Sequence, residues 1–476
     1  MRRSLNTLKG HACRQALTAT VLVALAAAIP AYAAGGLDKR FGAGGRVRSQ
    51  FGVGSEPSSE AFAGAVDSAG HLLVVGTATN SQEGLNLLLA RYLSNGALDS
   101  SFGFGGSVVT QVGLGPFPTS TGVGLLVQPD GNLVVASSAT DEFGAPAFAV
   151  SRFTVAGTLD ETFGTRGTIV SQLGSGASTS ASSEPIALAR QHDGKLLLVG
   201  KGTDRGGNDQ VAIARYTASG IDRDYGSAGS VVTQLGVGSE RFSEGLAVAI
   251  ARGQRAVVAG NATDSKGREQ VAVARFTASG VLDRTFGQRG VRLIQLGNGP
   301  TPSSRALAVA VLPDQRVVVV GDATDKGGHQ AVALARFSAS GKLDKHFGGD
   351  GRVVVQLGTR CGDCSSAAPL SSADSIALAP GGKILVGGQA SSAGGYNVLL
   401  ARFTSSGNPD RTFGSKGHRL TQLGSRCSPG CDAPAALSNA ETLLLRRDGG
   451  IFVAGRATDR SGNNVVATAR FRPSAR

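Results

Sequence analysis

Short apolar segments alternate with polar, glycine-rich segments along most of the chain, and this alternation predicts β-strands. Residues 306–358 show the pattern clearly: ALAVAVLPDQRVVVVGDATDKGGHQAVALARFSASGKLDKHFGGDGRVVVQLG. Runs of β-branched and small apolar residues bounded by Gly, Asp and Pro are typical of strands. The segment therefore predicts four strands, ALAVAVL, RVVVVGDAT, QAVALARFS and RVVVQLG. No stretch keeps the 3.6-residue period of an amphipathic helix over a useful length.

This four-strand unit recurs along the chain. One marker is an Arg before an aromatic residue, usually ARF or ARY, and it occurs at Arg91, Arg152, Arg215, Arg275, Arg336, Arg402 and Arg470. A second marker is a Gln that precedes an apolar residue and Gly, and it occurs at Gln50, Gln111, Gln172, Gln234, Gln295, Gln356 and Gln422. Seven units of four strands predict an all-β fold, a seven-bladed β-propeller with four antiparallel strands per blade.

The two ends of the chain hold complementary parts of one unit. Residues 35–52, GGLDKRFGAGGRVRSQFG, match the end of a unit, whereas the last residues, ATARFRPSAR, match only its beginning. An open array would leave an unpaired strand edge and exposed apolar sheet faces. We therefore expect residues 35–52 to complete the last blade, formed by 441–476, so that 34–476 is a single propeller domain.

The repeated motif also resembles a known family. The combination of ARF or ARY with a following LDxxFGxxG, at spacings of roughly 60 residues, is similar to the delta-60 repeat family of bacterial proteins. The resemblance covers nearly all of residues 34–476 and implies a β-propeller. It implies no particular biochemical role.

The N-terminus reads as a signal peptide over residues 1–33. A basic start is followed by an apolar run from Ala16 to Pro30 and by the small-residue cleavage signal AYA, which ends at Ala33. The alternative is a signal-anchor helix, although the run is short for a bilayer span. We expect an exported protein, periplasmic or secreted, with no transmembrane span after signal removal.

Composition and charge narrow the range of partners. The 476-residue chain has 70 Gly, no Trp, 5% aromatic residues and a formal net charge of +13. The predicted signal peptide carries four of the basic side chains and no acidic one, so the remaining chain is moderately basic. Aromatic platforms for single-stranded nucleic acid are not evident. We expect a monomer that binds no nucleic acid.

An Asp accompanies every repeat, in the LDxxFG motif. These residues are Asp38, Asp99, Asp160, Asp222, Asp283, Asp344 and Asp410. Because the Asp and the marker Arg occur in every unit, we interpret both as structural: the Asp as a turn-forming residue and the Arg as its partner. The Phe of the motif, once a Tyr, is expected to pack between blades, and the Gln to form scaffold hydrogen bonds. The Asp of the ATD hairpins lacks the ligand pattern of a calcium loop, so no metal or cofactor is expected.

Four cysteines remain after the predicted signal peptide, in two equivalent loops. They are Cys361, Cys364, Cys427 and Cys431, in the motifs CGDC and CSPGC. In an exported protein this even number favours two disulfides, each closing a short loop, although pairing between the loops is also possible. A zinc site formed by all four cysteines is a weaker alternative.

The sequence leaves the function open and identifies no catalytic residue. The connections between the fourth strand of one unit and the first strand of the next are rich in Ser and Pro and vary most. Loops on a rigid scaffold commonly carry binding residues, so we expect a non-enzymatic binding protein that engages a protein, glycan or envelope polymer through this face. Two alternatives stay open: a hydrolase or lyase with a site at the mouth of the central channel, and a purely structural adhesion module. Acidic or His side chains that converge on the channel mouth from different blades would favour the enzyme.

Overall fold

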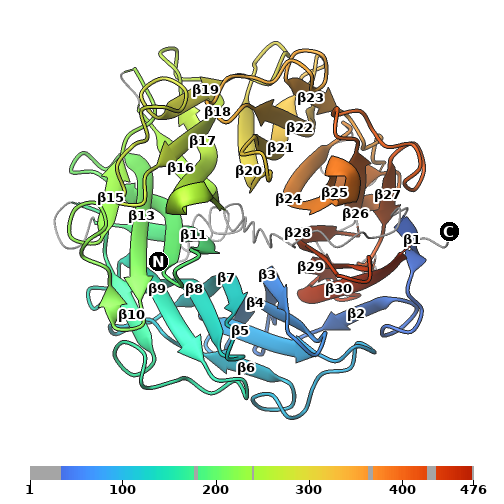
Figure 1. Cartoon of the computed structure of the whole chain (residues 1–476). Helices are drawn as coiled ribbons and strands as arrows, with labels where there is room; N and C mark the ends of the chain where they lie inside the picture. Colours follow the sequence, from blue (N-terminus) through green and yellow to red (C-terminus); the bar gives the residue numbers. More distant parts are fainter. Residues whose placement is uncertain (1–33, 176–180, 239–240, 363–367, 426–435, 474–476) are drawn as a thin grey trace.

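Seven sheets surround a central axis, as blades of a propeller (Figure 1); five have four strands, and two have an additional short strand. The computed structural model describes residues 34–175, 181–238, 241–362, 368–425 and 436–473. Neighbours within every sheet are antiparallel, and the innermost strand of each blade contacts that of the next. The predicted fold class, a seven-bladed all-β propeller, is confirmed.

The first three blades follow the order of the chain from the inside outward. Blade one contains β3 (Ser59–Val66), β4 (Leu72–Thr79), β5 (Leu85–Tyr92) and β6 (Ser107–Thr110). Blade two contains β7 (Ser120–Val127), β8 (Leu133–Thr140), β9 (Pro146–Phe153) and β10 (Thr168–Ser171). Blade three contains β11 (Ser183–Arg190), β12 (Leu196–Thr203), β13 (Asp209–Thr217), the two-residue β14 (Gly220–Ile221) and β15 (Ser230–Thr233).

The other blades repeat this arrangement. Blade four contains β16 (Ser243–Ala251), the 3-10 turn η1 (Arg252–Gln254), β17 (Arg255–Thr263), β18 (Glu269–Phe276) and β19 (Val291–Ile294). Blade five contains β20 (Ser304–Val311), β21 (Val317–Thr324), β22 (Gln330–Phe337) and β23 (Arg352–Val355). Blade six contains β24 (Ser371–Ala379), the 3-10 turn η2 (Pro380–Gly382), β25 (Lys383–Ser392), β26 (Gly395–Phe403) and β27 (His418–Thr421). Blade seven contains β28 (Ser438–Leu445), β29 (Ile451–Thr458), β30 (Asn464–Pro473), β1 (Ala34–Leu37) and β2 (Arg46–Ser49).

The two ends of the chain meet in blade seven. β2 pairs with β30 from Arg46 opposite Ala469 to Ser49 opposite Val466, and β1 pairs with the last residues of β30. The N-terminal segment thus supplies the outer strand that the C-terminal segment lacks, and Figure 1 shows the blue and red ends side by side. This pairing leaves no blade incomplete and confirms the predicted closure of the ring.

The core consists of apolar layers between adjacent blades, and the layers on the two sides of blade five are continuous with each other. Phe102 of blade one, for example, packs with Leu125, Leu133 and Phe153 of blade two. Small residues allow this close packing: Gly157 has a φ of +88°, and a Cβ there would lie 3.0 Å from the ring of Phe102. At this seam the aromatic residue of the LDxxFG motif, Phe102, therefore packs between two blades, as predicted.

The two faces of the ring differ in their connections. The turns between the first and second strands and between the third and fourth strands lie on one face, which we call the turn face. The hairpins between the second and third strands and the connections between blades lie on the other, which we call the loop face. The described part of the chain contains no helix with the length and apolar character needed to cross a bilayer. Residues 1–33, the predicted signal peptide, lie outside the described residues.

Ring closure predicts how the N-terminal segment contributes to stability. Deletion of residues 35–52 should lower the free energy of unfolding by about 3–5 kcal/mol, the scale expected for loss of a buried network, because the edge of β30 loses its partners. Moving the same segment to follow residue 473 should restore most of the loss. Urea denaturation followed by circular dichroism measures both; equal stability of the deleted and permuted chains would contradict the pairing.

Candidate functional site

The repeated Arg and Asp residues form one ion pair in each blade. Their N–O distances lie between 2.7 and 2.9 Å in blades one to six and reach 3.4 Å in blade seven. The pairs are Arg91–Asp99, Arg152–Asp160, Arg215–Asp222, Arg275–Asp283, Arg336–Asp344, Arg402–Asp410 and Arg470–Asp38. In blades one to six the guanidinium also stacks over the motif's aromatic ring, 4.7 to 5.0 Å from its centroid. The residues that sequence analysis singled out thus lie within individual blades, on the turn face, and do not converge on one site.

Several of these pairs also connect adjacent blades. Arg91 donates to the carbonyl oxygen of Val155 at 2.7 Å, and Arg336 donates to that of Ser405. The Gly after the aromatic residue adds a backbone bond across the same seam, as between Gly103 N–H and the Ala156 carbonyl at 2.8 Å. Burial of Asp344 raises its pKa, but the backbone N–H of His346 and two guanidiniums outweigh this and lower the pKa to about 2. Such contacts fit a structural role.

The marker Gln and the hairpin Asp are also engaged in local hydrogen bonds. Gln295 accepts a bond from Ser304, the buried first residue of β20, at 2.8 Å, and donates to backbone carbonyls on either side. Asp264 accepts the backbone N–H groups of Lys266 and Arg268, which fixes the hairpin turn. In the described residues no group of three or more His, Cys, Asp and Glu side chains is arranged to hold a metal ion.

The charged residues that do converge lie at the inner ends of the blades, at the channel mouth considered for the enzyme alternative, although none of them was singled out from the sequence. The second residue of the innermost strand is Glu60, Thr121, Glu184, Glu244, Arg305, Ser372 or Asn439, in blade order. Cross-strand partners extend this group, which we call the mouth belt: Lys201 opposite Glu184, Asp322 opposite Arg305 and Arg456 opposite Asn439. The belt lies near the loop face, where the innermost strands begin.

Ion pairs connect the mouth belt within and between blades. Arg305 forms a two-point contact with Asp322, at 3.2 and 2.7 Å, and Arg456 of blade seven contacts Glu60 of blade one at 3.2 Å. The Nζ atom of Lys201 lies 3.8 Å from Oε2 of Glu184 and 3.2 Å from Oδ2 of Asp209. The side chains of Glu184 and Arg305 are each 33% exposed, so solutes can reach the belt.

Two further carboxyl groups lie one step deeper in neighbouring blades. The fourth residue of the innermost strand, at a β-bulge, is apolar in blades one to five but is Asp374 in β24 and Glu441 in β28. Ser372 donates to Asp374 at 2.7 Å, and Asn439 donates to Glu441 at 2.7 Å. Burial raises the pKa of both carboxyl groups, and the negative charge of Asp322 adds to the shift of Asp374 as that of Asp374 adds to the shift of Glu441. Burial also raises the pKa of Glu244 to about 7, although Lys201 opposes the shift.

Exposed apolar side chains gather on the loop face of blade two. Leu114 and Phe117 precede β7 and are 48% and 85% exposed, and Phe143, in the β8–β9 hairpin, is 62% exposed. The loop lies on the hairpin because Leu114 exchanges hydrogen bonds with Thr140. The candidate binding surface therefore includes an apolar rim as well as the charged belt.

The cysteine prediction falls mainly outside the described residues. Cys361 is buried, with 1% of its surface exposed. Its candidate partners Cys364, Cys427 and Cys431 lie outside the described residues. The disulfides therefore remain a prediction.

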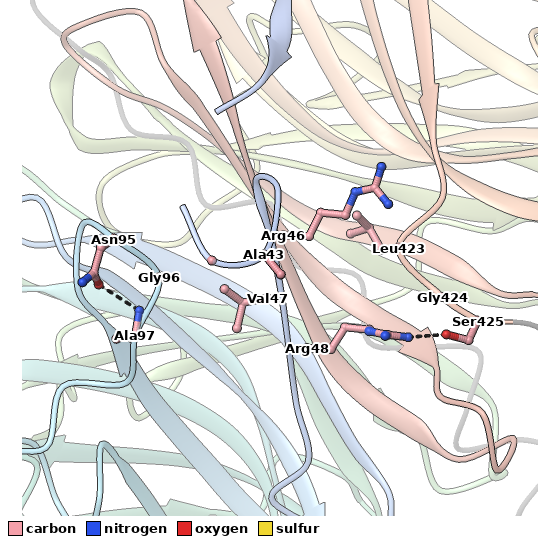
Figure 2. A pocket seen from close by; sticks show the side chains of 11 residues that line it. Ala43, Arg46, Val47, Arg48, Asn95, Gly96, Ala97, Leu423, Gly424 and Ser425 are labelled. Carbon is pink, nitrogen blue, oxygen red and sulfur yellow. Dashed lines mark hydrogen bonds between the residues drawn. The ribbon is translucent and has the colours of Figure 1, made fainter. Parts of the chain in front are cut away.

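A hollow of about 680 Å³ lies at the outer edge of blade seven, away from the belt (Figure 2). It is lined by β2, by residues 95–97 and by residues 423–425, and Arg48 donates to the Ser425 hydroxyl across it. The hollow is partly open to solvent and follows the seam that the closing strand makes with its neighbours. We attribute it to ring closure rather than to ligand binding.

Comparison with known proteins adds a family to this geometry. Residues 70–102, 128–163, 191–220, 256–286, 312–347 and 380–413 match the family model described as "Domain of unknown function (DUF5122) beta-propeller". Six segments of the chain are thus similar to DUF5122 β-propeller repeats. Each matched segment covers the second and third strands of a blade, and most extend to the aromatic residue of the LDxxFG motif. In blade seven the corresponding segment is divided between the two ends of the chain. No curated protein matches the chain.

Solved structures resemble the chain in fold only. A Dyadobacter fermentans protein of unknown function is 12% identical, with a TM-score of 0.39, over 90% of this chain and all of its own. A PL25 ulvan lyase is 9% identical, with a TM-score of 0.41, over 93% of this chain and 95% of its own. Drosophila semaphorin 1a is 13% identical, with a TM-score of 0.42, over 89% of this chain and 88% of its own. Enzymes and non-enzymes are thus both among the structures found, and no function follows from them.

The contacts between blades predict that equivalent arginines differ in importance. Arg336→Met should lower the free energy of unfolding by about 3 kcal/mol, since it breaks a buried ion pair and a bond to the next blade. Arg152→Met should cost less than half as much, because among the described residues Arg152 makes no such bond to blade three. Guanidinium denaturation of the two variants provides the measurement. Equal losses would show that the connection between blades contributes nothing.

The carboxyl groups of the channel predict the pH dependence of stability. Asp374, Glu441 and Glu244 have pKa values raised by folding, so the native state binds more protons than the unfolded state from about pH 4 to neutrality and above. Stability should therefore rise as the pH falls from 8 to about 5. Below about pH 4 it should fall, because the lowered pKa values of Asp264 and Asp344 act in the opposite sense.

Denaturation midpoints between pH 3 and pH 9 test this profile. The matched control is the double variant Asp374→Asn, Glu441→Gln, whose curve should be flatter between pH 5 and pH 8 and higher at pH 8. A wild-type protein that is more stable at pH 8 than at pH 5 would contradict the assignment.

Proposed function

We propose that the protein is an exported, non-enzymatic binding protein that engages a cationic polymer through the loop face at the channel mouth. Residues 1–33 act as the signal peptide, the mature protein is periplasmic or secreted, and the repeats belong to the delta-60 type. The observation that carries the proposal is the convergence of charged side chains from blades one and three to seven on one end of the ring. Charged groups are normally depleted from protein interiors, and their concentration in one place is typical of functional sites.

Charge supports a cationic ligand. The mouth belt with its neighbours and the two deeper positions contain eight carboxyl groups against Lys201, Arg305 and Arg456. The carboxyl groups are Glu60, Glu184, Asp209, Glu244, Glu269, Asp322, Asp374 and Glu441. The full chain has a net charge of +13, of which residues 1–33 contribute four, so the rest of the chain is still basic. An acidic concavity on a basic protein concentrates the electrostatic attraction for cations at that place, while the apolar rim with Phe117 supplies contact area beside it.

A binding experiment with defined polymers tests this function. Poly-L-lysine, chitosan, dextran and alginate are titrated into the protein at low and physiological salt, and binding is followed by calorimetry. At least one cationic polymer should bind, more weakly as the salt concentration rises. The triple variant Glu60→Gln, Glu184→Gln, Glu244→Gln should weaken binding at least about tenfold, equivalent to ~1.4 kcal/mol.

The matched control neutralises acidic residues on the opposite face. This control is the triple variant Asp130→Asn, Asp193→Asn, Asp314→Asn. The three residues lie in turns between first and second strands, and their neutralisation should leave binding within about twofold of wild type. Absence of binding to every polymer, or an equal loss in both triple variants, would overturn the proposal.

The convergence of acidic side chains from different blades, which the sequence-based criterion assigned to an enzyme, also favours a second candidate, a hydrolase or lyase at the channel mouth. Asp374 and Glu441 are adjacent carboxyl groups whose pKa values are raised, and a carboxyl group that stays protonated near neutral pH can act as a general acid. Release of reducing ends or unsaturated products from the same polymers, abolished by Asp374→Asn, would establish this function in place of the first.

A further inference from the structure

The fourth residues of the innermost strands form one ring around the axis of the propeller. This axial ring consists of Phe62, Val123, Ile186, Leu246, Leu307, Asp374 and Glu441. Ile186, Leu246 and Leu307 come from three successive blades, yet they contact one another and belong to none of the layers between blades. The side chain at this position therefore points toward the axis in blades three to five, and the bulge register is the same in blades six and seven. Val123 packs in the layer between blades two and three as well. The ring is apolar along five blades and acidic along two.

The acidic arc contains hydrogen-bond acceptors without donors. Asp374 uses Oδ1 to accept from Ser372, and Glu441 uses Oε1 to accept from Asn439. The remaining oxygens, Asp374 Oδ2, Glu441 Oε2 and Asn439 Oδ1, are buried and have no hydrogen-bond partner. All three residues are at least 95% buried. Buried polar atoms are nearly always paired in native proteins, so three acceptors left together indicate a missing donor.

The charges around this arc favour a cation over a neutral donor. Asp374 faces Asp322 and Arg305 on one side, and Glu441 faces Arg456 and Glu60 on the other. Arg305 is already held by Asp322 and Arg456 by Glu60, so neither guanidinium neutralises the two carboxyl groups fully. A cation between Asp374 and Glu441 would restore ionisation of both.

We propose that the axial ring binds an alkylammonium group, with the ammonium at Asp374, Asn439 and Glu441 and the alkyl stem along Ile186, Leu246 and Leu307. An ammonium group has three N–H donors and no acceptor, which matches three unpartnered oxygens. The aliphatic stem matches the apolar arc, since burial of each methylene group is favourable. This inference rests on the proposed function, because it names the group of the cationic ligand that enters the ring.

Calorimetric titration with n-butylammonium tests the site, with n-butanol as the uncharged control of the same length. Butylammonium should bind and butanol should not. Because the amine binds the ionised carboxyl groups, binding should release protons and tighten at least about tenfold between pH 6 and pH 8. Release is measured by repeating the titration in buffers of different ionisation enthalpy.

Conservative variants test the site. Asp374→Asn and Glu441→Gln should each weaken butylammonium binding at least about tenfold, whereas Asp130→Asn, on the turn face, should leave it within about twofold. Both ring variants remove a buried charge without changing shape, and circular dichroism verifies their folding. A lysine-containing tripeptide that binds more tightly than butylammonium identifies a lysine side chain as the source of the amine; weaker binding of the tripeptide identifies a free amine.

Three results would overturn the inference: equal binding of butylammonium and butanol, unchanged binding by Asp374→Asn, or displacement of butylammonium by micromolar Ca²⁺, which would indicate a metal site. If a cationic polymer binds, and the belt substitutions weaken its binding, but butylammonium does not bind, only this inference is wrong. If neither binds, the proposed function is lost as well.

Discussion

The pairing of β2 with β30 is the constraint on which the rest of the structure depends. Each blade buries both sheet faces against its neighbours, and this is possible for all seven only when the ring is closed. The closing segment also connects blade seven to blade one, since Gly42 donates to the Asn95 carbonyl at 2.7 Å and Arg470 donates to that of Ser94 at 3.1 Å. Closure therefore fixes the positions of the innermost strands, and through them the distances between side chains around the axis.

The fold could be predicted because its determinants are repeated. The Arg of ARF and the Asp of LDxxFG recur in every unit and pair in every blade, and in blades one to six the guanidinium also stacks on the motif's ring. Finer features were less accessible. The buried serines that begin the innermost strands, such as Ser304, bond to the marker Gln of the preceding blade, and their role becomes clear only once the seam between blades is known.

The candidate site could not be predicted in the same way, because it consists of departures from the repeat. The departures that the sequence makes obvious lie in the loops between blades, whereas the relevant ones occupy the innermost strands. The signal was present: when the units are aligned on Ser304, Ser371 and Ser438, an apolar position becomes Asp374 and then Glu441. What the sequence lacks is the register at the bulge, which decides whether this position points toward the axis or between blades.

Stability alone does not explain these departures. Burial of a carboxyl group without full compensation opposes folding, and five of the seven blades show that a Val, Leu, Ile or Phe fits the same position. The scaffold contacts are almost symmetric, whereas the channel mouth is not: blade two contributes Thr121 and Val123, and blades six and seven contribute the acidic pair. Proteins commonly depart from the rules of stable packing at functional sites. The asymmetry of an otherwise regular ring is therefore the strongest physical argument that its channel mouth has a ligand.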